Sequence, residues 1–220
     1  MADAPPIELD RTLSRKERDW LRHEQEILDA AERVFCAKGF HAAGIQEIAA
    51  EADFGVGTIY RYFKSKDDIY QAMFLRKAQH VLLLCREAAA LTDDPVEKLR
   101  QVVLTKSRYF HLHNDFFRIY FAEMRSAACQ PHPGGSPAMT ELFAEFQDWL
   151  TTICEDGIQR GIFRPIKARY LAAAFEGMGN AFRILYLEEQ SADDFEQRLN
   201  AVLSIFFDGC CRRAPEGPVA

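Results

Sequence analysis

Apolar residues recur at three- and four-residue spacing along nearly the whole chain, a pattern that an α-helix explains and a β-strand does not. Signals for helix starts agree with it. Ser14 precedes Glu17 at the spacing of a capping box, and Pro95 follows Asp94 where a first helical turn accepts proline. We therefore predict an all-α fold of about nine helices. Their predicted ranges are near 15–38, 45–52, 56–63, 66–90, 95–112, 115–128, 137–160, 167–189 and 192–211.

The composition is that of an ordinary globular protein, with 48% of the 220 residues apolar and 27% charged. That length is enough for two modest domains with buried cores. No apolar run approaches the roughly 18 residues that a membrane-spanning helix needs. The first ten residues carry Asp3, Glu8 and Asp10, where a secretory signal would be basic and then apolar. We expect a cytoplasmic protein with no membrane partner.

The stretch from Gly39 to Lys66 predicts a helix-turn-helix. Two short helices flank the turn Asp53-Phe54-Gly55, and the helix before them offers apolar residues at core spacing. In this motif the second short helix enters the major groove of DNA. Gly57 would let the backbone approach DNA closely, and the Tyr60 hydroxyl and the Lys64 ammonium are suited to phosphate contacts.

The same stretch resembles the DNA-binding domain of the TetR family of repressors. The resemblance covers residues 18–70 and rests above all on the run 57–66, which is Gly-Thr-Ile-Tyr-Arg-Tyr-Phe-Lys-Ser-Lys. It implies that Gln46 and Val56 read bases, and that phosphates are held by Thr58, Tyr60, Tyr62 and Lys66. The full set of predicted DNA-binding residues is Gln46, Val56, Gly57, Thr58, Tyr60, Tyr62, Lys64 and Lys66.

Two places depart from the family pattern, and both remove a hydroxyl cap. Ala43-Gly44 stands where the family usually has Ser or Thr, and the turn 53–55 replaces the usual Gly-Val-Ser. Such a cap is worth roughly 1 kcal/mol. Glu47 and Glu51 also add negative charge near the DNA, and the formal net charge is −6. An alternative therefore stays open, a helical dimeric small-molecule sensor whose DNA binding has degenerated.

The chain divides into four predicted parts. They are a disordered arm (1–12), a helix-turn-helix DNA-binding domain (13–66), a helical domain for ligand binding and dimerisation (67–212) and a disordered tail (213–220). Basic residues in 11–22 would add DNA contacts. A helix that starts at Ser65 would join the two domains without a flexible linker.

The C-terminal domain is rich in aromatic residues, which predicts a sizeable apolar cavity for an effector. The candidate ligand-pocket residues are Tyr109, Phe116, Phe117, Arg118, Tyr120, Phe121, Trp149, Phe175, Met178 and Phe182. Arg118, which lies among aromatic residues, is the candidate anchor for an anion or a carbonyl group. Aromatic residues at helical spacing also build ordinary cores, and that alternative stays open.

Two long helices of this domain have the features of a dimer interface. They are the segment 143–163 and the helix 167–189, where the small residues Ala173, Gly177 and Ala181 would allow close approach. Two such helices from each chain would form a four-helix bundle. A two-fold homodimer would bind a roughly palindromic operator on double-stranded DNA.

Motifs of enzymes and metal sites are absent from the sequence: there is no phosphate-binding Gly loop, no nucleophile elbow and no His-Glu-x-x-His. His111 and His113 would point to different sides of a helix, and Cys129 and His132 have no identifiable partners. We predict no enzyme activity, no metal and no cofactor; an enzyme built around His111 and Glu123 is the third interpretation.

The function that these patterns favour is a ligand-responsive DNA-binding transcriptional regulator. In its simplest form it is a repressor that a small apolar or amphiphilic effector releases from a palindromic operator. The identity of the effector, the operator, the choice between repression and activation, and any role of the cysteines stay open at this point.

Overall fold

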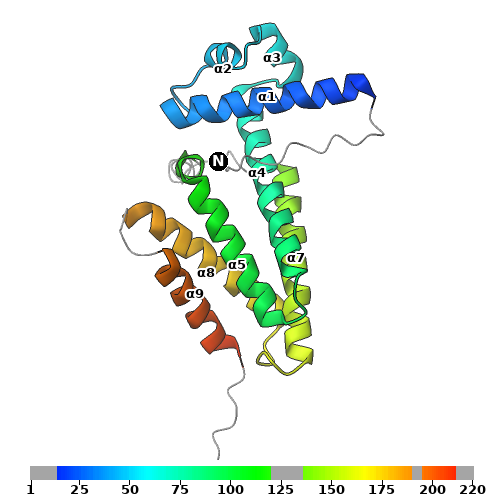
Figure 1. Cartoon of the computed structure of the whole chain (residues 1–220), viewed down its shortest axis with the longest axis vertical. Helices are drawn as coiled ribbons and strands as arrows, with labels where there is room; N and C mark the ends of the chain where they lie inside the picture. Colours follow the sequence, from blue (N-terminus) through cyan, green and yellow to red (C-terminus); the bar gives the residue numbers. More distant parts are fainter. Residues whose placement is uncertain (1–13, 120–135, 190–194, 212–220) are drawn as a thin grey trace, which may run out of the picture. The chain divides into compact units, whose positions relative to one another are not determined.

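The computed structural model describes residues 14–119, 136–189 and 195–211, and within them the protein is all-α, as predicted (Figure 1). The helices are α1 (Arg15–Lys38), α2 (Ile45–Glu51), α3 (Val56–Tyr62), α4 (Lys66–Ala89), α5 (Pro95–Leu112), α7 (Pro137–Gln159), α8 (Ala168–Glu189) and α9 (Phe195–Cys210). Residues 114–119 are also helical. The rest of the helix predicted at 115–128, the predicted arm and the predicted tail lie outside the described residues.

Local signals in the sequence explain where α1 begins and ends. The Ser14 hydroxyl accepts a hydrogen bond from the backbone N–H of Glu17 (3.3 Å), and the Glu17 carboxylate accepts one from the backbone N–H of Ser14 (2.8 Å). These two bonds complete the predicted capping box. Gly39 follows the helix with a φ of 79°, a conformation that glycine adopts without the steric cost of a Cβ.

The contacts divide the chain into two compact units. The first runs to His80 and takes in residues 113–139. Within it α2 and α3 pack on one side of α1 (Figure 1), around a fully buried core that includes Ile27, Ile48 and Ile59. This unit therefore holds the predicted helix-turn-helix together with the first part of α4.

The second unit comprises residues 81–112 and the chain from 140 onward. Here α5, α8 and α9 pack together, and α7 buries Phe146, Leu150 and Cys154 in the core. α4 thus belongs to both units, and the contacts separate them after His80. The domain boundaries drawn from the sequence, 13–66 and 67–212, stay a prediction. None of the helices in the described ranges has an apolar stretch long enough to cross a membrane.

Candidate DNA-binding surface and effector domain

The turn between α2 and α3 is held by the backbone. Asp53 adopts a φ of 56°, a left-handed conformation that Asp tolerates better than most residues. The backbone N–H of Phe54 donates to the carbonyl of Ala49 (2.9 Å), and Ile59 of α3 is fully buried. Gly55 precedes α3 and provides no side-chain cap, as its sequence implies. The turn and the buried isoleucine together fix which face of α3 points outward.

That outward face carries most of the residues predicted to bind DNA. Gln46 on α2 and Gly57, Tyr60 and Lys64 are exposed, and the side chain of Tyr60 is 54% exposed. The other four predicted residues are partly exposed: Val56, Thr58, Tyr62 and Lys66. The structure therefore brings the whole set to the surface of one small unit, and their contacts with DNA stay a prediction.

Lys66 is bound within its own unit. Its ammonium group donates to the carbonyls of Phe40 (2.6 Å), Ala43 (2.9 Å) and His41 (3.3 Å) and lies 4.4 Å from the centre of the Phe40 ring. An ammonium group has three protons to donate, and three carbonyls use them. In the free protein Lys66 therefore ties the start of α4 to the loop before α2, a role that the sequence did not reveal.

An aromatic cluster that the sequence analysis missed joins α1 to the end of α3. The centres of the Trp20 and Tyr62 rings are 4.0 Å apart, and the Tyr62 hydroxyl forms a hydrogen bond with Nδ1 of His23 (3.1 Å). The His23 ring also meets the Phe54 ring edge-on. Trp20 and His23 lie three residues apart and so share one face of α1, but no local pattern shows that this face meets Tyr62.

The acidic residues of α2 have basic partners on α1. Glu47 forms an ion pair with Lys38, and Arg33 lies 2.5 Å from Glu51. The hydrogen bonds from Lys38 and from the backbone N–H of Gly44 hold the pKa of Glu47 below its ordinary value. The carboxylate of Glu47 thus replaces part of the cap that the missing hydroxyl would supply. Repulsion of DNA by these two acids is weaker than the sequence alone predicts.

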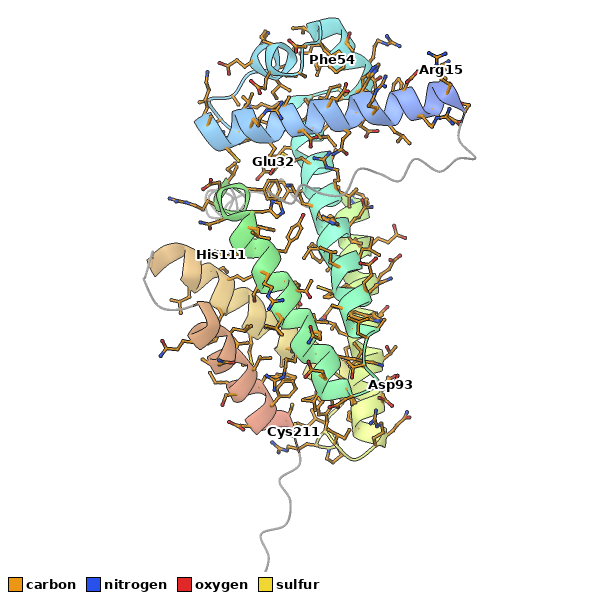
Figure 2. All side chains as sticks on the ribbon, viewed as in Figure 1. Arg15, Glu32, Phe54, Asp93, His111 and Cys211 are labelled. Atoms are coloured by element: carbon orange, nitrogen blue, oxygen red, sulfur yellow. The ribbon has the colours of Figure 1, made fainter. Side chains whose placement is uncertain are left out.

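Two ion pairs join α1 to α4 within the first unit. Arg76 lies 2.6 Å from Asp29, and the buried ammonium of Lys77 lies 2.9 Å from Glu32. Figure 2 shows Glu32 on α1 beside α4. Nδ1 of His113 lies 3.3 Å from the same ammonium of Lys77. α4 therefore holds α1, and with it the helix-turn-helix, by polar contacts as well as by its buried apolar face.

The residues predicted to line an effector pocket are divided between the units. Phe116, Phe117 and Arg118 belong to the first, where Phe116 is buried with its ring centre 4.3 Å from that of Phe74. Arg118, the predicted anchor, is exposed. Tyr120 and Phe121 lie outside the described residues.

The remaining predicted pocket residues belong to the second unit: Tyr109, Trp149, Phe175, Met178 and Phe182. Phe175 packs on Phe206 of α9, with ring centres 5.2 Å apart. Trp149 lines a pocket of about 270 Å³ together with Arg86, Lys98 and Asp156. The role of all these residues in effector binding stays a prediction.

The second unit also contains a charged cluster that the sequence analysis did not identify. Lys106 of α5 donates to the carboxylate of Glu176 on α8 at 2.5 Å, and Arg183 of α8 lies 3.5 Å from the same oxygen. Burial alone would raise the pKa of Glu176, but the two cations outweigh that effect and hold its pKa below the ordinary value. The sequence signal is faint because Lys106 lies 70 positions before its partner.

The outer face of α8 is mostly apolar, with Arg169 and Asn180 as exposed polar residues among its described side chains. Its exposed residues include Tyr170, Ala173, Ala174, Gly177, Ala181, Ile184 and Leu185, and on α9 the side chain of Ile205 is also exposed. The other helix assigned to a dimer interface, α7, buries most of its large apolar residues inside its own unit and leaves Phe143 exposed. The apolar face open to a second copy therefore lies chiefly on α8 and α9.

Two parts of the chain match known families. Residues 27–73 match bacterial regulatory proteins of the tetR family, and residues 92–183 match the tetracyclin repressor-like C-terminal domain. The first match contains α2 and α3 with the turn between them, and the second contains α5, α7 and most of α8.

Individual proteins agree with these matches. The chain is 34% identical to the fatty acid metabolism regulator protein of Bacillus subtilis over 140 residues, which are 62% of this chain and 68% of that one. It is 31% identical over 96 residues to the transcriptional activator FasR of Mycolicibacterium smegmatis, a match that spans 44% of that protein. The crystal structure of Bacillus subtilis FadR in complex with stearoyl-CoA shares the fold, with a TM-score of 0.72 at 22% identity over 84% of this chain and 98% of that one. The chain belongs to the TetR family of DNA-binding transcriptional regulators.

Proposed function

We propose that this protein is a cytoplasmic, ligand-responsive repressor that binds a near-palindromic operator as a homodimer and is released by an amphiphilic effector with an apolar body. The observation that carries the DNA-binding part is the outward face of α3. There the phenol of Tyr60 and the backbone at Gly57 are exposed, and the exposed side chain of Lys64 follows two residues after the helix ends. Phosphate oxygens accept hydrogen bonds from such groups.

The relatives support the chemistry of the effector. One matched protein regulates fatty acid metabolism, and a structural neighbour was solved with stearoyl-CoA bound. The second unit of this chain has a core rich in aromatic and aliphatic side chains, which is the lining that an acyl chain needs. The proposed effector binds and dissociates without chemical change, so no catalytic residue is assigned.

The connections between the units would carry the effector's signal. α4 passes from the first unit into the second, and the chain returns to the first unit after α5. Because Arg76 and Lys77 hold Asp29 and Glu32 of α1, a displacement of α4 would be passed to α1. The signal requires that the effector bind the DNA-competent and the released states with different affinity.

Tyr60→Phe tests the DNA-binding surface because it removes one exposed hydroxyl and keeps the ring. We expect affinity to fall roughly fivefold to tenfold through the loss of one hydrogen bond, and to fall alike for operator and for unrelated duplexes. Fluorescence anisotropy at about 0.15 M salt measures it, since specific Kd values there lie near 10⁻⁸ to 10⁻¹¹ M. A changed operator preference at unchanged overall affinity would contradict the phosphate contact.

A random-library duplex selection tests the whole proposal. Selective binding to a near-palindromic site, followed by release when a long-chain acyl compound is added, is the expected result. Failure to select any site would favour the alternative, a dimeric sensor with degenerate DNA binding. The absence of a side-chain cap at both Gly44 and Gly55 is the observation that speaks for that alternative.

A further inference from the structure

The cluster of Lys106, Glu176 and Arg183 contains more positive than negative charge. Their side chains are only 11%, 17% and 12% exposed, respectively. Arg183 also donates to the side-chain carbonyl of Asn180, which is neutral. In the part of the chain that the structure describes, Glu176 is the one carboxylate that acts on either cation. Counted over the described side chains, the cluster therefore has one positive charge in excess in the interior of the second unit.

The surroundings of the cluster make this excess costly. The Lys106 ammonium lies 4.9 Å from the centre of the Phe146 ring on α7, and Cys85 of α4 is fully buried beside the cluster. Burial raises the pKa of the Cys85 thiol to about 12, so it stays neutral and offers no countercharge. Burial likewise lowers the pKa of Lys106, with a further contribution from the repulsion of Arg183. A charge in an interior of low dielectric constant needs an opposite charge close by.

The backbone of α8 positions one of the two cations. A Cβ at position 179 would lie 3.2 Å from Nη1 of Arg183, so the glycine there leaves space for the guanidinium to lie along its own helix. Lys106 reaches the same oxygen of Glu176 from another helix, α5. The two donors converge on one carboxylate oxygen from two helices, which is the geometry that a second oxyanion could share.

We propose that Lys106 and Arg183 form the binding site for the acidic head group of the effector, and that this head group is a single carboxylate at the end of an apolar chain. The inference rests on the proposed function, because it specifies the chemistry of the effector. One positive charge in excess matches one negative charge. A free fatty acid supplies that charge at its carboxylate, whereas a coenzyme A thioester has an uncharged carbonyl there and several negative charges on distant phosphates.

Three probes that share one twelve-carbon alkyl chain distinguish these head-group chemistries: dodecanoate, dodecanol and dodecanoyl-CoA. Calorimetric titration of the full-length protein at neutral pH is expected to show that dodecanoate binds at least about tenfold more tightly than dodecanol, a difference of about 1.4 kcal/mol in binding free energy. Equal affinity for the acid and the alcohol overturns the proposal, and so does the absence of dodecanoate binding. Tight binding of dodecanoyl-CoA alone assigns recognition to the coenzyme phosphates and overturns it too.

Two substitutions give opposite expected results. Lys106→Met leaves a balanced pair of Glu176 and Arg183, so it should abolish the preference for the acid and retain dodecanol binding. Glu176→Gln leaves two unbalanced cations, so it should tighten dodecanoate binding by about tenfold although it destabilises the free protein. A purely structural cluster would instead weaken all ligands in both variants. Arg100→Met, on the same helix but in an exposed ion pair with Glu97, should change nothing.

Operator release, measured in parallel by anisotropy, separates the two proposals. If dodecanol or dodecanoyl-CoA releases the protein from the operator and dodecanoate does so no better, the effector-controlled repressor is supported and the carboxylate site is refuted. If dodecanoate binds with the expected dependence on Lys106 and Glu176 but leaves operator affinity unchanged, the carboxylate site stands and the effector-controlled repressor fails. Should Glu176→Gln not fold, the acid-to-alcohol ratio of Lys106→Met decides the matter alone.

Discussion

The two units of this protein treat their interior cations differently. In the first, Lys77 is 5% exposed and pairs with Glu32, and Arg76 pairs with Asp29, so each of these two cations of α4 has a carboxylate of its own on α1. In the second, Lys106 and Arg183 share Glu176. A one-to-one pair joins two helices and satisfies both charges. A carboxylate shared by two cations leaves one positive charge that an anion can neutralise. The pairs of the first unit therefore act as a rigid connection, and the cluster of the second unit has the charge that an anionic ligand needs.

The largest expected effect is on the one-to-one pairs. Glu32→Leu leaves the Lys77 ammonium buried without its carboxylate, and we expect the free energy of unfolding to fall by about 3 kcal/mol or more. Urea unfolding followed by circular dichroism measures it. Glu51→Leu, which breaks the exposed pair with Arg33, is the matched control and should cost less than about 1 kcal/mol. Similar small losses in both variants would mean that Lys77 does not depend on its partner.

The shared carboxylate should respond asymmetrically. Glu176→Gln leaves two cations facing each other and is expected to lower the free energy of unfolding by about 3 kcal/mol. Lys106→Met leaves a balanced pair and should change it by less than about 1 kcal/mol, in either direction. The same urea experiment without ligand compares them. Equal losses would remove the contrast between the two units, because they would make the cluster an ordinary structural triad.

Lys66 sharpens the comparison at the surface of the first unit. Because its ammonium is bound to three carbonyls, Lys66→Met should lower the free energy of unfolding by about 1–3 kcal/mol. If the carbonyls keep this ammonium when DNA binds, the substitution should leave the salt dependence of operator binding almost unchanged, in contrast to the phosphate contact that the family resemblance implies. Lys64→Met should do the reverse, with little change in stability and a log–log salt slope reduced by about 1. If Lys66→Met also reduces the salt slope, the Lys66 ammonium exchanges its carbonyl hydrogen bonds for a phosphate contact when DNA binds.

The smallest effect concerns pH. Burial lowers the pKa of Lys106 from its ordinary value of 10.5. Between the lowered value and 10.5 the unfolded chain binds a proton that the folded chain has released, so stability contributed by this site rises with pH across that window. The melting temperature of the wild type should therefore increase relative to that of Lys106→Met as the pH rises toward 10.5. A constant difference would mean that Glu176 fully offsets the burial of Lys106.

Local signals were sufficient to predict the helices. The capping box at Ser14, the glycine at position 39 and the apolar spacing act over three or four residues, and the structure confirms the all-α fold that they imply. The helix-turn-helix was predictable for the same reason, since the run 57–66 is contiguous. Surface placement of the predicted DNA-binding residues follows from burial of Ile59 on the opposite face of α3.

Contacts over long distances in the sequence were not predictable. No residue near Lys66 in the sequence indicates that its ammonium will donate hydrogen bonds to the carbonyls around Phe40. Likewise, no residue near Tyr62 indicates that its ring will pack against Trp20. The contact between Lys106 and Glu176 could not be predicted because the two residues lie on different helices, 70 positions apart in the sequence. The aromatic neighbours of Arg118 in the sequence predict an anchor for the effector; the structure leaves its side chain exposed, and its role in binding stays a prediction.

The two tryptophans of the chain, Trp20 and Trp149, give the protein a natural optical reporter in each unit. Trp20 lies against Tyr62 at the end of α3, so its emission will respond when DNA approaches that surface. Trp149 lies against Phe146, the ring that also covers the Lys106 ammonium, so its emission will respond to events near the charged cluster. With one indole removed at a time, the delay between effector entry and operator release becomes directly observable in unlabelled protein.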